Sequence, residues 1–154
     1  MTRISWDHAS LAVSAIDPAI AFFETGFGFR VTFVERGMSE QIASMLGHPG
    51  AACDLAQLAL PDGGPKLELI AFSGTLGPST SQAEPLELPV RPGAGHIALR
   101  STSFDATLKR LLELGAEPVG TVTNFSDGRS VYLRTRFGAF VELEEQCQGD
   151  EGGA

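Results

Sequence analysis

The sequence is poor in cysteine, tyrosine and tryptophan, with two, one and one of these among 154 residues. Two cysteines, Cys53 and Cys147, cannot build a disulfide framework, and their spacing fits no metal or redox pair. We therefore expect two thiols in a reducing compartment. Basic side chains are also scarce, with 11 against 19 acidic ones and a net charge of −8. This balance argues against nucleic acid or an anionic membrane surface as the main partner.

Long apolar runs are absent as well. No stretch approaches the roughly 18 residues of a membrane-spanning helix, and the first residues lack the apolar core of a signal peptide. Hydrophobic residues make up 43% and charged residues 19% of the chain, which is an ordinary globular balance. We expect a cytoplasmic protein without membrane or nucleic-acid partners.

What the sequence does contain is an internal repeat. Shifting the chain by 88 residues places His96 on His8 and Leu99 on Leu11, and further apolar positions follow in step. In both copies a histidine opens a strand-like run of alternating polarity. Because a repeat at a fixed offset dictates architecture, we expect two copies of one structural module.

The pattern along each copy predicts the order β-α-β-β-β, and hence an α+β fold. In the first copy we expect strands over 4–14, 29–36, 54–60 and 66–72, with a helix that Asp17 caps and Pro18 opens. In the second we expect a helix after Thr102 and strands over 96–101, 119–125, 130–134 and 139–144. The predicted domain boundaries are a first module at 1–72 with an insertion at 37–52, a linker at 73–93, a second module at 94–147 and a frayed tail at 148–154.

Two glutamates complete the repeat. Glu68 and Glu142 lie in the last strand of their modules, opposite the more consistently apolar face. A lone strand glutamate is usually a solvated residue, but two histidines and two glutamates at repeat-related positions favour a common role. Imidazole and carboxylate ligands together suit Zn, Ni, Co, Mn or Fe. His8, Glu68, His96 and Glu142 are therefore candidate ligands of one divalent metal ion, whereas His48 has no repeat partner and is expected to be a loop residue.

The stretches around these four residues resemble the vicinal oxygen chelate superfamily, which includes glyoxalase I, methylmalonyl-CoA epimerase, fosfomycin- and bleomycin-resistance proteins and extradiol dioxygenases. The similarity covers Trp6 to Glu145 and rests on the motifs His8-Ala-Ser-Leu-Ala-Val, Leu67-Glu-Leu-Ile, Gly95-His-Ile-Ala-Leu and Gly138-Ala-Phe-Val-Glu-Leu. It implies paired βαβββ modules that form a curved mixed sheet around a central cleft holding the metal. The chain departs from many relatives at Thr135-Arg136, where they have Asp-Pro.

Four protein ligands are typical of glyoxalase I and the epimerase. The resemblance thus ranks a metal-dependent lyase or isomerase first, with Glu68 and Glu142 as catalytic base and acid that shift a proton next to a metal-bound carbonyl. An extradiol ring-cleavage dioxygenase is the second hypothesis, and a metal-free binding or resistance protein the third.

Three further interpretations concern the surroundings of the metal. Arg100 shares the His96 face by alternation, and Arg134 and Arg136 lie near the last turn, so each is either a contact for an anionic substrate group or a surface residue. Tyr132, the only tyrosine, is either a substrate contact or a wall residue. Residues 37–49 are expected to form a lid or wall over the cleft, or else a packing helix between subunits. The resemblance also implies a homodimer.

Overall fold

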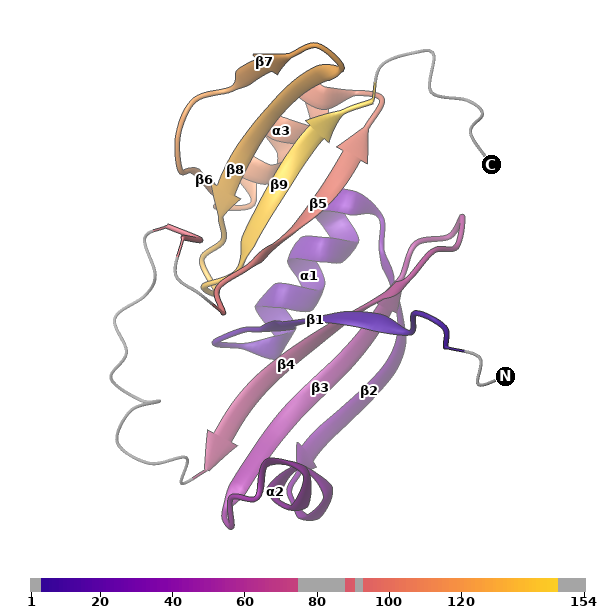
Figure 1. Ribbon diagram of the computed structural model, residues 1–154, viewed down its shortest axis with the longest axis vertical. Coiled ribbons are helices and arrows are strands. Elements are labelled where there is room, and N and C mark those ends of the chain that lie inside the picture. Colours follow the sequence, from indigo (N-terminus) through magenta and orange to yellow (C-terminus); the bar gives the residue numbers. More distant parts are fainter. Residues whose placement is uncertain (1–3, 75–87, 91–92, 147–154) are drawn as a thin grey trace. The chain divides into compact units, whose positions relative to one another are not determined.

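The computed structural model describes residues 4–74, 88–90 and 93–146, and it divides the chain into two compact units, Met1–Glu84 and Pro85–Ala154 (Figure 1). The predicted tail, Cys147 and most of the predicted linker lie outside the described residues. Each unit is described below by itself. None of the described helices has the length and apolarity needed to cross a membrane.

The described residues of the first unit form a mixed four-stranded sheet and two helices. The strands follow the order β1-β4-β3-β2; β1 runs parallel to β4, and the other neighbours are antiparallel. In chain order the elements are β1 (His8–Ala12), α1 (Ile16–Phe27), β2 (Arg30–Met38), α2 (Glu40–Leu46), β3 (Ala51–Ala59) and β4 (Lys66–Gly74).

The second unit repeats this plan, but its described residues include no counterpart of α2. Its sheet follows the order β5-β9-β8-β6, with β5 parallel to β9 and β7 paired with β8. The elements are β5 (His96–Ser101), α3 (Phe104–Glu113), β6 (Glu117–Pro118), β7 (Thr123–Phe125), β8 (Gly128–Arg134) and β9 (Phe140–Glu145). The α+β fold class is confirmed. Each unit follows the β-α-β-β-β order, apart from the additional helix α2 in the first unit and the division of one predicted strand into β6 and β7 in the second.

Strand register shows that the two units are copies at the level of single residues. In the first unit His8 lies opposite Lys66, two residues before Glu68. In the second, His96 lies opposite Phe140, again two residues before Glu142. The sequence repeat therefore extends to hydrogen-bond pairing, and it places each histidine and glutamate on the same face of neighbouring strands.

One face of the first sheet is covered by α1. The helix buries Phe22 and Phe23, and the sheet buries Leu58 and Leu69, of which Phe23, Leu58 and Leu69 are fully buried. α1 contacts β3 and β4 on this side. Burying a large apolar side chain contributes about 1.5–3 kcal/mol, so this layer stabilises the unit.

The prediction that Asp17 is the N-cap of α1 is wrong. The N-cap is Ala15, which makes no side-chain cap bond, and Asp17 lies in the first turn. Its carboxylate is paired instead with the guanidinium of Arg36 in β2. Pro18 is still accommodated, because amides of the first turn have no acceptor within the helix.

The single strand predicted over 119–125 is also wrong. Four residues separate Pro118 in β6 from Thr123 in β7, whereas only two separate their partners, Leu133 and Ser130, in β8. The surplus residues leave the ladder between β6 and β7. Gly120 and the missing amide hydrogen of Pro118 weaken continuous pairing further.

The end of β4 depends on a close approach between two glycines. Gly74 has a φ of 84°, and a Cβ added there would lie 2.1 Å from the carbonyl oxygen of Gly50. We expect Gly74→Ala to destabilise the protein by roughly 2–4 kcal/mol, because it combines a left-handed backbone with a backbone clash. Urea unfolding followed by circular dichroism measures the change.

Gly63→Ala is the matched control. Gly63 has a similar φ of 88°, but a Cβ added there would meet no atom within 4 Å, so only the backbone term of about 1 kcal/mol applies. Equal losses in the two variants would contradict a role for the Gly50 contact.

Candidate functional site

His8 and Glu68 lie together on the face of the first sheet opposite α1. They come from the neighbouring strands β1 and β4, and His8 Nε2 is 3.7 Å from Glu68 Oε1. Ser10 donates a hydrogen bond of 2.9 Å to the same carboxylate oxygen. The glutamate side chain is 13% exposed and the histidine 35%. A carboxylate this buried needs polar partners, and Ser10 supplies one.

His96 and Glu142 form the matching pair of the second unit. His96 Nε2 is 3.0 Å from Glu142 Oε2, and Ser130 donates a 2.6 Å hydrogen bond to Oε1. The exposures, 32% and 16%, nearly repeat those of the first pair. Glu142 lies between the fully buried Val141 and Leu143, which confirms the predicted alternation of faces.

Tyr132 packs directly against the second pair. It is the cross-strand neighbour of Glu142, and its ring contacts the His96 ring edge-on with centroids 4.8 Å apart. Burial, the negative charge of Glu142 and a hydrogen bond to that carboxylate raise the pKa of the Tyr132 phenol. The phenol therefore keeps its proton over a wider pH range than a solvent-exposed tyrosine. Gln57 occupies the matching place beside Glu68 in the first unit.

Arg100 lines a cavity next to Glu142. The cavity measures about 190 Å³, and its lining includes Arg100, Glu144 and the exposed ring of Phe125. Arg100 Nε donates a 2.8 Å hydrogen bond to Glu144. Its predicted position on the His96 face is thus confirmed by the register, since Arg100 pairs with Glu144 two residues beyond Glu142. Arg134, at the end of β8, donates a 2.7 Å hydrogen bond to Glu117.

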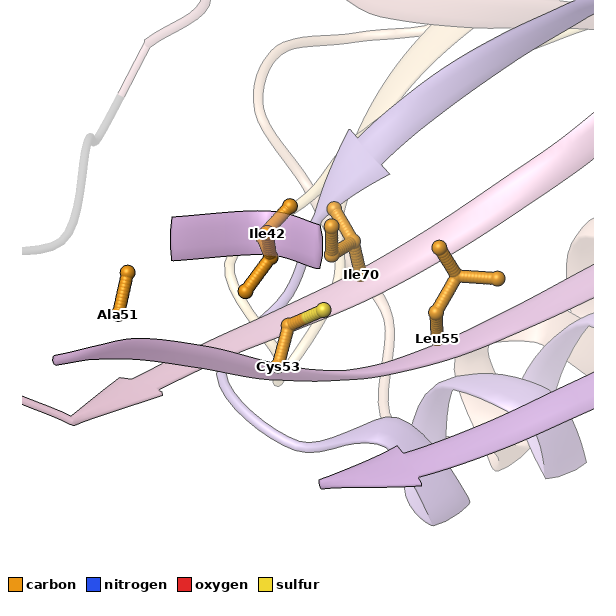
Figure 2. Packing of buried hydrophobic residues seen from close by; sticks show 5 residues of the cluster. All are labelled: Ile42, Ala51, Cys53, Leu55 and Ile70. Atoms are coloured by element: carbon orange, nitrogen blue, oxygen red, sulfur yellow. The ribbon is translucent and has the colours of Figure 1, made fainter. Parts of the chain in front are cut away.

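Helix α2, the core of the insertion, packs on the Glu68 face of the first sheet. Its Ile42 joins Cys53, Leu55 and Ile70 in a buried apolar cluster, in which these sheet side chains point toward the helix (Figure 2). Burial raises the pKa of the Cys53 thiol, so this cysteine is an inert packing residue. Helix α2 is thus packed on the sheet face that carries Glu68, and its role as a wall of the cleft stays a prediction.

The same register positions differ in character between the two units. Leu55 and Ile70 pair two residues beyond Gln57 and Glu68. Their counterparts two residues beyond Tyr132 and Glu142 are Ser130 and Glu144. In the first unit these positions are closed by α2, whereas in the second they line the cavity.

Asp7 contacts the other ring nitrogen of His8. Its Oδ2 is 2.8 Å from His8 Nδ1, and its Oδ1 is 3.6 Å from Lys66 Nζ. The hydrogen bond with His8 and the charge of Lys66 hold the pKa of Asp7 below its usual value. The sequence reasoning missed Asp7, Ser10 and Ser130, whose only signal is their position next to a candidate ligand or across from it in the ladder.

The donor set of each unit fits a divalent cation, but it supplies only two ligands. Within the described residues of either unit, no group of three or more His, Cys, Asp and Glu side chains is placed to hold one ion. Two imidazoles and two carboxylates suit metals from Mn to Zn. A four-ligand shell therefore requires both units, and it stays a prediction.

The single tyrosine makes the second pair testable without metal. We expect the phenolate absorbance near 295 nm to appear with a midpoint above pH 10, because burial and Glu142 disfavour the anion. Glu142→Gln removes the facing charge and should lower this midpoint. Glu144→Gln, whose charge has the smallest effect on Tyr132, is the control and should shift it less. A midpoint unaffected by Glu142→Gln would contradict the contact.

Comparisons with known proteins agree on one family. The sequence model of the Glyoxalase/Bleomycin resistance protein/Dioxygenase superfamily matches residues 5–143. Among solved structures, a glyoxalase family protein from Bacillus cereus is 26% identical with a TM-score of 0.79, and the match covers 94% of this chain and 95% of that one. A comparison with curated proteins found no match.

Two further solved structures share the fold. A glyoxylase/bleomycin resistance protein/dioxygenase domain from Frankia is 17% identical with a TM-score of 0.66, covering 96% of each chain. A variant of the fosfomycin resistance protein FosX from Listeria monocytogenes, solved with Mn(II) and a dihydroxypropylphosphonic acid, is 16% identical with a TM-score of 0.61 and covers 96% of this chain and 94% of that one.

Proposed function

Since the chain belongs to the glyoxalase/bleomycin resistance protein/dioxygenase superfamily, we propose that it is a divalent-metal-dependent lyase or isomerase of the glyoxalase I or epimerase type. In this proposal His8, Glu68, His96 and Glu142 hold one metal ion. The reaction moves a proton on the carbon next to a carbonyl of a small-molecule substrate. The proposal also takes over the homodimer and the cytoplasmic location expected from the sequence.

One observation carries the proposal: two histidine–glutamate pairs recur in the same strand register with nearly the same exposure. A chance surface histidine would not be matched by a half-buried glutamate in both units. When bound, the ion would supply Lewis-acid polarisation of a substrate oxygen. FosX from Listeria monocytogenes, whose structure contains Mn(II), makes Mn²⁺ a suitable first ion to test.

The two glutamates differ in how firmly they are held. Both oxygens of Glu142 are engaged, one by Ser130 and the other by the adjacent His96. In Glu68, Oε1 accepts the hydrogen bond from Ser10 and also faces His8. Within the described residues, no hydrogen bond or ion pair reaches Glu68 Oε2. We therefore assign the proton-accepting role to Glu68, whose carboxylate is freer to move, and the positioned acid role to Glu142.

A ring-cleaving dioxygenase is the second candidate, and Tyr132 is the observation that favours it. Its phenol lies beside His96 and has a raised pKa, and in this reaction it would serve as the acid that gives a proton to the catecholic substrate. Such a reaction requires Fe(II) or Mn(II) and O₂. A metal-free binding protein is the third candidate, and it requires none of the four residues to bind an ion.

Metal binding is the first test. We expect Glu68→Gln and Glu142→Gln each to weaken Mn²⁺ or Zn²⁺ binding at least tenfold, and the Glu68→Ala, Glu142→Ala double variant to abolish it, because a shell of fewer ligands loses charge and geometry. Isothermal titration measures the affinities of the chelator-treated protein. Glu24→Gln, an exposed change of equal charge on α1, is the control. Full metal occupancy in the double variant would rule the site out.

The reaction itself is tested by proton exchange. We expect anaerobic incubation in D₂O with 2-oxo and 2-hydroxy compounds to give metal-dependent deuterium incorporation next to the carbonyl, measured by proton NMR. Glu68→Gln should abolish the exchange, since Glu68 is the base. Oxygen uptake with a catechol and no exchange would instead establish the dioxygenase. Absence of both, together with unchanged ligand binding after metal removal, would favour the binding protein.

A further inference from the structure

Asp7 contacts His8 on the side of the ring away from Glu68, and we propose that it is a positioning residue for the metal. By this proposal the Asp7 carboxylate keeps the proton of the neutral His8 ring on Nδ1, so that the lone pair of Nε2 faces Glu68. The inference rests on the proposed function insofar as Nε2 is the metal-binding atom. Nothing in the repeat predicts this residue.

The two distances to the His8 ring decide which nitrogen carries the proton. Asp7 Oδ2 lies 2.8 Å from Nδ1, and an ionised carboxylate only accepts hydrogen bonds, so Nδ1 must donate. Nε2 lies 3.7 Å from Glu68 Oε1, which is too long for a hydrogen bond. His8 is therefore arranged as a donor on one side and an available acceptor on the other.

Lys66 holds Asp7 in this position. Its Nζ is 3.6 Å from Asp7 Oδ1, and its backbone amide donates to the Asp7 carbonyl oxygen at 3.3 Å. Lys66 is also the cross-strand neighbour of His8 in the parallel β1–β4 pair. The ladder that sets the His8–Glu68 register thus also fixes the carboxylate behind the ring.

The second unit lacks this arrangement. The residue preceding His96 is Gly95, and within the described part of the chain no carboxylate is bonded to His96 Nδ1. The ring is held instead by its edge-on contact with Tyr132. Its Nε2 lies 3.0 Å from Glu142 Oε2, which favours a proton on Nε2 in the metal-free protein. The two candidate ligands should therefore rest in opposite tautomers.

Ring tautomers of the metal-free protein give the first test. Long-range ¹H–¹⁵N correlation spectra above pH 7.5 should show His8 protonated on Nδ1 and His96 on Nε2. Asp7→Asn should move His8 toward the Nε2-protonated form and leave His96 unchanged, whereas Glu24→Gln should change neither. The Asp7 side chain is 67% exposed, so the fold should persist. A His8 tautomer that is the same in Asp7→Asn as in the unaltered protein would overturn the proposal.

Metal affinity gives the second test. A ligating histidine that loses the partner of its other nitrogen typically binds metal 10- to 100-fold more weakly. We expect Asp7→Asn to weaken Zn²⁺ binding about tenfold or more by titration, and Asp7→Glu, which keeps a carboxylate, to recover most of the affinity. Unchanged affinity in Asp7→Asn would remove Asp7 from metal positioning. If the unaltered protein binds neither Zn²⁺ nor Mn²⁺, the proposed function fails, while the tautomer spectra still decide the role of Asp7 toward His8.

Discussion

The parallel pairing of the first and last strand in each unit is the constraint on which the candidate site depends. In a sheet, a shift by one residue moves every side chain to the other face. The register that sets His8 opposite Lys66 and His96 opposite Phe140 places both glutamates on the face of their histidines. The helix-covered apolar layer opposes any slip, because Leu69 and Leu143 would then leave the core. Core packing and ligand placement are therefore fixed by the same hydrogen-bond ladder.

Much of the fold followed from periodicity, because the two histidines and two glutamates mark equivalent strands in a repeated module. Most of the element order and the alternation of faces were predictable from local pattern. The cap of α1 was not, since Asp17 forms an ion pair with Arg36 from a different strand. Tertiary contacts of this kind decide local boundaries and leave no trace in the spacing of residues.

The candidate site was predictable in its four central residues and less so in its surroundings. Ser10 lies in β1 of the first unit, whereas Ser130 lies in β8 of the second, which is not the counterpart of β1. The repeat therefore does not relate the two serines. Asp7 has only Gly95 as its counterpart. The contacts that these residues make with the candidate ligands depend on the geometry of side chains on neighbouring strands. An internal repeat predicts only the residues that match in both copies, and so it gives no indication of the residues in which the two units differ.

Because α2 occurs in the first unit and has no described counterpart in the second, the two units differ in what lies next to the glutamate. At the places next to the glutamate, the first unit carries a sealed apolar cluster and the second carries a polar cavity lined by Arg100 and Phe125. A change in the sealed cluster disturbs packing and so costs stability, whereas a change at the cavity wall leaves the core intact. Under the proposed function, the second unit is therefore the half in which a new substrate preference can evolve or be engineered, whereas most changes to the apolar cluster of the first unit would lower its stability.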